Sequence, residues 1–134
     1  TTGDETNYKQ LKILILENFQ AFPINEIRDI ILLAINYCIR CLNNGEASYL
    51  KEIFEWYKMG LRENIFIING KLSRFTYNNI IIAGLKLKEY KWVKDFMEQY
   101  KNYIENAYQH DTYYFNLAAL ISIYHNRNIL FRKV

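Results

Sequence analysis

The chain contains two cysteines and two histidines, whose side chains could support redox, metal or nucleophilic chemistry. Cys38 and Cys41 spell C-x-x-C, but a redox pair of this kind places its first cysteine at a helix N-terminus, where the thiolate is stabilised. Here both cysteines fall late in a predicted helix, where the helix dipole opposes a thiolate. A structural zinc needs four ligands, and His110 and His125 lie far along the chain. We therefore predict that both cysteines pack in a core within a reducing compartment, and that the protein holds no metal.

The sequence contains no pattern typical of a catalytic site. His110 and His125 fall at predicted helix boundaries, and no Ser, Cys or Asp constellation accompanies either histidine. The chain also lacks a glycine-rich phosphate loop, an H-E-x-x-H helix and a paired-carboxylate motif. We therefore predict a protein that is not an enzyme and that uses no cofactor.

Four lysines form a basic patch across one predicted turn: Lys86, Lys88, Lys91 and Lys94. Lysines near the end of a helix commonly remain solvated and satisfy its last carbonyl groups. The net charge is +3 and the pI is 8.8, whereas a pI above about 9 with clustered basic residues is typical of nucleic-acid-binding domains. We therefore do not expect a nucleic acid as partner, and contact with RNA through this patch is the alternative.

The elements that would position these residues repeat along the chain. An asparagine, a turn residue nine positions later and an apolar anchor five positions beyond that occur three times. Self-similarity of this kind is typical of stacked helical hairpins, in which each unit buries its apolar face against the next. The three sets are Asn36/Gly45/Leu50, Asn79/Lys88/Val93 and Asn116/His125/Leu130.

Apolar residues at helical spacing predict about six helices and the start of a seventh. The predicted ranges are 8–22, 25–43, 47–61, 74–88, 90–108 and 111–126, with a seventh from 129. Asn25 is the predicted N-cap of the second helix, which is apolar on almost every side, as in a helix packed on two sides. Residues 64–71 predict an ordered loop whose Ile65 and Phe66 fill the core, and a small β-hairpin around Asn69-Gly70 is the alternative.

The second hairpin resembles a known repeat family. The stretch Tyr77-Asn78-Asn79-Ile80, followed by Lys88-Glu89-Tyr90, Val93 and Met97, resembles a tetratricopeptide repeat (TPR), although Ile81 replaces the small residue of that motif and Lys88 its turn glycine. Residues 36–130 are similar to large uncharacterised repeat proteins of Bacteroidetes-type bacteria. The resemblance implies an all-α fold, a right-handed α-solenoid of stacked antiparallel hairpins over about residues 25–61, 74–108 and 111–134.

The same resemblance implies a non-enzymatic scaffold that binds a protein or peptide. In TPR-like stacks the first helix of each hairpin lines the concave side. On this chain that gives a mostly apolar row, which we expect to be packed rather than open: Ile35, Ile39 and Leu42, then Asn78, Ile82 and Lys86, then Phe115, Ala119 and Ser122. The candidate partner-binding residues are Asn78, Ile82, Lys86, Phe115 and Ala119.

The alternative function is a pentatricopeptide-like module that binds single-stranded RNA. Phe75-Thr76-Tyr77-Asn78-Asn79-Ile80-Ile81 resembles the opening of such a repeat, which reads one RNA base per helical hairpin. Spacings of 43 and 37 residues between successive asparagines differ from the regular 35 of that family. The corresponding positions of the other two units, Ala34-Ile35 and Tyr114-Phe115, are also mostly apolar, whereas a base code needs polar readers.

Length and composition predict a single domain over residues 1–134. A composition with 51% hydrophobic residues is sufficient for a core, and no apolar run approaches the roughly 18 residues that suggest a membrane span. The first residues are polar and include no initiator methionine, so we expect a fragment of a longer chain. We predict a cytoplasmic protein.

Overall fold

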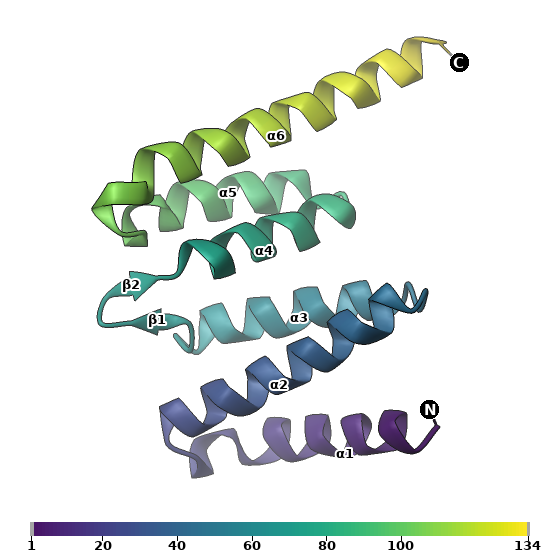
Figure 1. Cartoon of the computed structure of the whole chain (residues 1–134), viewed down its shortest axis with the longest axis vertical. Coiled ribbons are helices and arrows are strands. Elements are labelled where there is room, and N and C mark those ends of the chain that lie inside the picture. Colours follow the sequence, from purple (N-terminus) through teal and green to yellow (C-terminus); the bar gives the residue numbers. More distant parts are fainter. Residues whose placement is uncertain (1, 134) are drawn as a thin grey trace. The chain divides into compact units, whose positions relative to one another are not determined.

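Six α-helices and one short β-hairpin make up the computed structural model, which describes the backbone of residues 2–133 and the side chains of residues 3–123 (Figure 1). All-α is therefore the correct fold class apart from the hairpin. In chain order the elements are α1 (Thr2–Asn18), the 3₁₀-helix η1 (Phe19–Ala21), α2 (Ile24–Asn43), α3 (Tyr49–Arg62), β1 (Ile67–Ile68), β2 (Lys71–Leu72), α4 (Arg74–Lys86), α5 (Tyr90–Tyr100), the 3₁₀-helix η2 (Lys101–Tyr103) and α6 (Asn106–Lys133).

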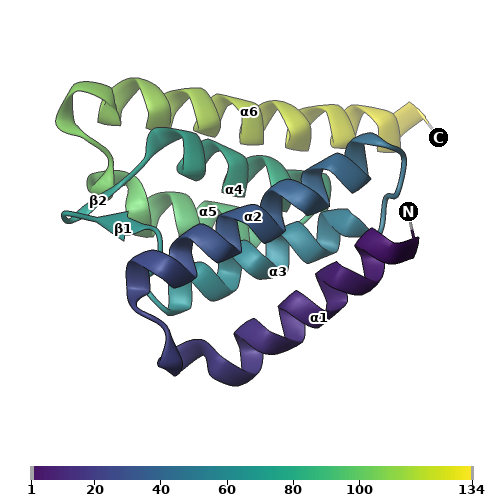
Figure 2. The same cartoon turned by 60° about the horizontal axis from the view of Figure 1, so that its bottom comes forward.

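The chain divides into two compact units, Thr1–Phe66 (unit 1) and Ile67–Val134 (unit 2). In unit 1, α2 and α3 form an antiparallel helical hairpin, and α1 packs along α2 (Figure 2). Unit 2 contains the β-hairpin, the antiparallel pair α4 and α5, and α6, which contacts both of these helices. Since α5 runs opposite to each of them, α4 and α6 run in the same direction (Figures 1 and 2).

The core of unit 1 follows the helical periodicity of α2 and α3. Ile27, Ile31, Cys38 and Phe54 are buried. Cys38 and Cys41 are both free and both buried, as the sequence predicts. Burial raises the pKa of the Cys38 thiol to about 11, so this thiol has little thiolate and little reactivity at neutral pH.

Aromatic rings fill the core of unit 2. Val93 is 0% exposed, and Phe96 contacts the rings of both Tyr77 and Trp92, at 5.1 and 5.4 Å between centroids. The Tyr77 hydroxyl donates a hydrogen bond to the backbone oxygen of Met97, 3.3 Å away, which joins α4 to α5. A buried phenol needs such a partner, so this contact helps to fix the helix pair.

The segment after α3 forms the β-hairpin that the sequence left as an alternative, so the loop prediction is wrong. Asn69 and Gly70 both have positive φ, 54° and 76°, as a type I′ turn requires. Ile67 pairs with Leu72, and Ile68 with Lys71. Ile65 and Phe66 are nevertheless buried, which confirms that this segment contributes to the core. Arg28 holds it by donating a hydrogen bond from Nε to the Ile65 backbone oxygen at 2.7 Å.

The turns after α2 and α4 have the same backbone geometry. Gly45 and Lys88, nine residues after Asn36 and Asn79, have φ angles of 94° and 62°. In each turn the next amide donates to a carbonyl five residues back, Glu46 to Cys41 at 3.0 Å and Glu89 to Gly84 at 2.9 Å. These bonds are typical of a Schellman C-terminus. The first two repeat sets therefore have turns of the same type.

Lys88 occupies a left-handed conformation that glycine adopts without steric cost. We expect Lys88→Gly to stabilise the protein by about 0.5–1 kcal/mol, because relief of this strain exceeds the entropy that glycine adds to the unfolded chain. A higher urea midpoint would show the gain. Lys88→Ala is the matched control, since it removes the same charge and keeps the strain. An equal gain in both variants would attribute the effect to charge.

The third repeat set does not match the first two. Asn116 is buried, whereas Asn36 and Asn79 are exposed. The backbone of α6 remains helical from Asn106 to Lys133, so the break predicted at residues 125–126, the seventh helix and the hairpin over 111–134 are all wrong. The side chains of His125 and Leu130 lie outside the described residues. A His-Asn pair tolerates helical geometry, and neither residue compels a helix to end.

Other boundaries and burial predictions also need correction. The helix predicted over 90–108 ends at Tyr100, and α6 begins at Asn106 rather than Asp111. Pro23, rather than Asn25, occupies the N-cap position of α2. Leu14 of α1 is exposed, whereas the neighbouring Ile15 is buried. Leu32 and Leu33 are exposed too, so α2 is not packed on two sides within the described residues.

Candidate functional site

The candidate residues of unit 2 lie on the adjoining surfaces of α4 and α6. Asn116 donates a hydrogen bond from Nδ2 to the Asn78 side-chain oxygen, 2.7 Å away, and also bonds to the Thr112 backbone oxygen at 2.9 Å. This amide pair joins the two helices at the middle of the surface. We call this surface the α4–α6 face; its members are Phe75, Asn78, Ile82 and Lys86 on α4 and Tyr108, Phe115 and Ala119 on α6.

The α4–α6 face is open and largely apolar. Ile82 is 49% exposed, Phe75 is 67% exposed and Phe115 is 72% exposed, so the expectation of a packed row is wrong here. Phe75 precedes Ile82 by seven residues, and Tyr108 precedes Phe115 by the same number. Seven residues are about two helical turns, so each pair lies on one side of its helix. The exposed rings and Ile82 therefore form two neighbouring apolar rows.

The corresponding row of unit 1 is packed. Ile35 is buried, and Ile39 and Leu42 are partly buried. The sequence-predicted concave row therefore behaves differently in the two units: it is packed in unit 1 and open in unit 2. Lys86 and Ser122 extend the open part and are both exposed.

Arg74 lies at the beginning of the α4–α6 face, and the sequence reasoning missed it. Its guanidinium carbon is 3.9 Å from the centroid of the Tyr108 ring and 5.0 Å from that of Phe75. Among the side chains that the structure describes, no carboxylate forms an ion pair with Arg74. The matching seven-residue spacings after Phe75 and Tyr108 are the signal that could have indicated this end of the surface.

A hydrogen bond on α5 and α6 fixes the far side of this helix pair. The Tyr113 hydroxyl donates to Oε1 of Glu98, and Lys101 donates to the other carboxylate oxygen, Oε2, at 3.2 Å. The bond from Tyr113, followed by that from Lys101, lowers the pKa of Glu98. The bond to Glu98 in turn raises the pKa of Tyr113 to about 12. These side chains hold α6 in place without reaching the α4–α6 face.

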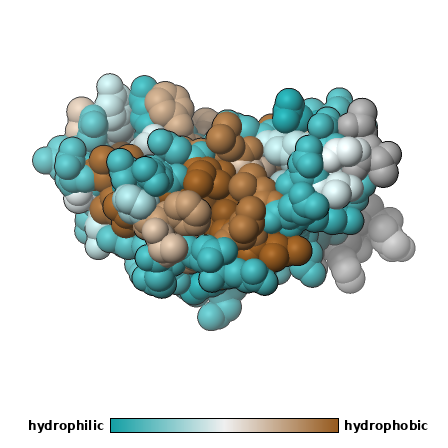
Figure 3. All heavy atoms as spheres, turned by 90° about the horizontal axis from the view of Figure 1, so that it is seen from below, coloured by the Kyte–Doolittle hydropathy of each residue, from teal (hydrophilic) through white to brown (hydrophobic). Residues whose placement is uncertain are grey.

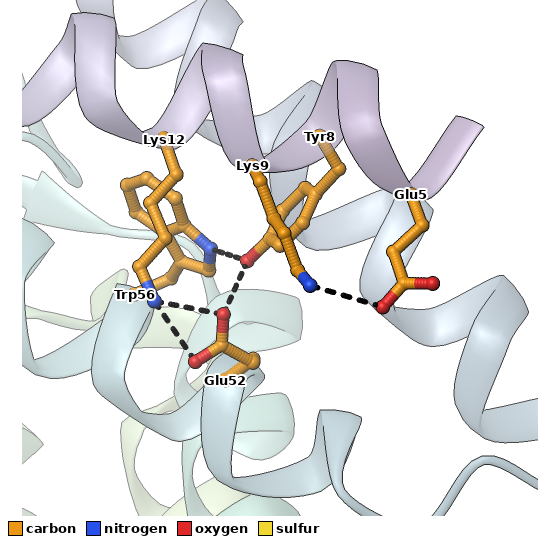
Figure 4. Close-up of polar contacts among 6 residues, drawn as sticks. All are labelled: Glu5, Tyr8, Lys9, Lys12, Glu52 and Trp56. Atoms are coloured by element: carbon orange, nitrogen blue, oxygen red, sulfur yellow. Dashed lines mark hydrogen bonds and ion pairs between the residues drawn. The ribbon is translucent and has the colours of Figure 1, made fainter. Parts of the chain in front are cut away.

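Unit 1 contains a polar cluster that joins α1 to α3 (Figure 4). Tyr8 is buried, accepts a hydrogen bond from Trp56 Nε1 at 2.7 Å and donates to Glu52 Oε1 at 2.9 Å. Lys12 donates to both oxygens of Glu52, at 2.8 and 2.9 Å. Burial raises the pKa of Tyr8. These groups provide one another's hydrogen-bond partners, so the cluster has a structural role: it holds α1 against α3.

Stability of unit 1 should therefore depend on pH through Glu52. Burial opposes ionisation of this carboxyl, but hydrogen bonds from Lys12 and Tyr8 outweigh burial and hold its pKa below 4.5. The ionised cluster then stabilises the fold fully above about pH 4.5, and this contribution is lost as the pH falls through the lower folded-state pKa.

We expect Glu52→Gln to lower the free energy of unfolding by about 1 kcal/mol or less at pH 7. The variant should also reduce the change of the urea midpoint with pH between pH 3 and 6. Glu55→Gln, in an exposed pair with Lys58, is the control and should leave the profile unchanged.

A second exposed apolar area lies on α1. Ile13, Leu14 and Leu16 are each more than half exposed. Figure 3 views the molecule from the α1 end of Figure 1 and shows apolar residues gathered within a polar border. The three residues point in different directions around the helix, because neighbouring positions differ by about 100°. They therefore form a broad apolar surface rather than a single row.

The described residues include no group of three or more His, Cys, Asp and Glu side chains arranged to hold a metal ion. Within the same part of the chain, no helix has the length and apolar character needed to cross a membrane.

The α4–α6 face and the polar cluster of unit 1 therefore differ in kind. The α4–α6 face combines apolar rows, an amide pair and an arginine that lies over two rings, while the groups of the unit 1 cluster satisfy one another. Comparison of the chain with protein-family models, with curated proteins and with solved structures found no match.

Proposed function

We propose that this protein is a non-enzymatic interaction module of TPR-like helical repeats, in which the α4–α6 face binds an extended segment of a partner protein. The observation that carries this proposal is the pair of apolar rows that unit 2 leaves open. Phe75, Ile82 and Phe115 are all about half exposed or more. Exposed apolar surface of this kind is typical of interaction sites.

Two features support the TPR-like part of the proposal. The helix pairs α2–α3 and α4–α5 are both antiparallel hairpins, and the turns at Gly45 and Lys88 share one hydrogen-bonding pattern. A right-handed α-solenoid built from these hairpins would present α4 and α6 as neighbouring first helices. A cytoplasmic location agrees with two free, buried cysteines.

Ile82→Glu tests the proposal. Because Ile82 is 49% exposed, its replacement should leave the fold intact, while a carboxylate at the middle of the face should abolish capture of apolar peptides. Ile121→Glu is the matched control: Ile121 is 59% exposed but points about 120° away from the Phe115 side of α6. Binding of a capped peptide array by the full chain, with circular dichroism of each variant, gives the measurement. Peptide binding that survives Ile82→Glu would contradict the proposal.

RNA binding is the second candidate, because Lys86, Lys88, Lys91 and Lys94 are all exposed around the α4–α5 turn. Lys91 already pairs with Asp95 at 3.6 Å, which reduces the local positive charge. We expect no micromolar, salt-sensitive affinity for single-stranded RNA. If such affinity were found, and if replacing the four lysines by glutamine flattened its salt dependence, RNA would replace the peptide as ligand.

A further inference from the structure

A cavity of about 390 Å³ lies at the beginning of the α4–α6 face. The β-hairpin, the start of α4 and the residues around the start of α6 line it. Leu72 and Ile104 are almost fully buried and line its interior, while Ile68, Phe75 and Tyr108 are its exposed apolar walls. Its volume is within the range of small-ligand sites, about 300–1,000 Å³, so it can accept one or two side chains of a peptide.

Two aromatic rings hold the cation of this cavity. The guanidinium carbon of Arg74 lies over the rings of Tyr108 and Phe75, 3.9 and 5.0 Å from their centroids, and such cation–π contacts hold the guanidinium group at this end of the face. Cation–π contacts do not use the N–H groups of the guanidinium, so these groups can still donate hydrogen bonds. A planar guanidinium binds a carboxylate through two parallel hydrogen bonds.

The charges around the cavity also favour an anion. Lys71 and Arg74 supply two positive charges, and Glu105 supplies one negative charge. The sum of these charges is one positive charge, so a singly charged carboxylate suits the cavity better than a phosphate, which carries about −1.5 to −2 charges at neutral pH. The ligand group is therefore a carboxylate beside apolar surface.

Resting on the proposed function, we infer that this cavity binds an acidic side chain of the partner segment, and that Arg74 is the residue that recognises it. Phe75 and Ile82 are about 10 Å apart along α4, because seven residues rise about 1.5 Å each. An extended chain covers this length in about three residues. The preferred segment therefore has Asp or Glu about three positions from a large apolar residue.

The test uses an array of hexapeptides acetylated and amidated at their ends, with Asp or Asn placed three positions from Phe or Leu. The full chain should bind the Asp members about tenfold more tightly than the Asn members, the size expected for one charge-assisted hydrogen-bonded pair. Arg74→Gln should remove this preference and leave affinity for the Asn members unchanged. Arg62→Gln, an exposed arginine of α3, should alter neither affinity.

Two further arms keep the outcomes distinct. Arg74→Lys retains the charge without the planar group and should restore only part of the preference; full restoration would contradict recognition by a planar guanidinium. Peptides with neutral side chains and a free C-terminus should bind no better than capped ones, and tighter binding would assign the cavity to a chain end. Binding without an Asp preference would overturn this inference alone, whereas no peptide binding at all would overturn the proposed function as well.

Discussion

Val93→Asp should abolish the cooperative thermal unfolding of this protein. Val93 is 0% exposed on α5, so the new carboxylate would have to enter the core without a partner. An unpaired buried charge costs about 3–5 kcal/mol, while small domains have only about 5–15 kcal/mol in total. Circular dichroism at 222 nm during heating is the measurement, and the expected result is a curve without a sigmoidal transition.

Lys94→Asp is the matched control for that variant. It places the same side chain one residue further along α5, where Lys94 is exposed. We expect it to melt within a few degrees of the wild type, because surface substitutions usually change stability by about 0.5 kcal/mol or less. If both variants melted like the wild type, Val93 would not be a core residue.

Gly60→Ala should destabilise unit 1 although alanine is the better helix former. An added Cβ at Gly60 would lie 2.1 Å from a ring carbon of Phe66, and that ring is buried and packs against Tyr57 at 5.8 Å. Alanine gains about 1 kcal/mol in helix propensity, but forcing the aromatic ring out of its site costs about 3 kcal/mol. The net loss should be about 2 kcal/mol in urea unfolding.

The Phe66→Ala background isolates the cause of that loss. With the ring removed, Gly60→Ala meets no clash, and only its helix propensity remains. The same substitution should then stabilise the protein by about 1 kcal/mol. This change of sign is the expected coupling between neighbours in a double-mutant cycle. Equal effects in both backgrounds would show that Phe66 does not limit the size of residue 60.

The sequence predicted most strongly those features that depend on local periodicity. Val93, Phe96 and Met97 are buried as their helical spacing requires. Ser73, of a residue type that commonly caps helices, is the N-cap of α4 and accepts a hydrogen bond from the Phe75 amide at 3.2 Å. Such features are predictable because each depends on a few neighbouring residues.

The boundary between α5 and α6 depends instead on a specific side chain. Gln109 donates hydrogen bonds from Nε2 to the backbone oxygens of Ile104 and Asn102, at 2.7 and 3.2 Å. These bonds satisfy carbonyl groups that the end of a helix leaves free. Residues 101–105 include no proline or glycine, so no ordinary stop signal marks the break. The predicted helix consequently continued to residue 108.

The candidate site was predictable in part for the same reason. Ile82, Lys86 and Phe115 were placed on the face by the repeat register, which depends on spacing alone. Arg74 and Tyr108 are separated by 34 positions in the chain, and their contact requires α6 to begin at Asn106. A sequence pattern that places the start of α6 five residues later could not bring these two side chains together.

The hydrogen bond between Asn78 and Asn116 fixes how α4 and α6 are aligned along their length, and with it the spacing of groups on the α4–α6 face. Sliding α6 by one helical turn, about 5.4 Å, would break a 2.7 Å bond and leave a buried amide without that partner. The two helices therefore have one permitted register. Distances between the arginine end of the face and the apolar centre stay constant while side chains adjust, so partners are distinguished by the spacing of their groups as well as by their chemistry.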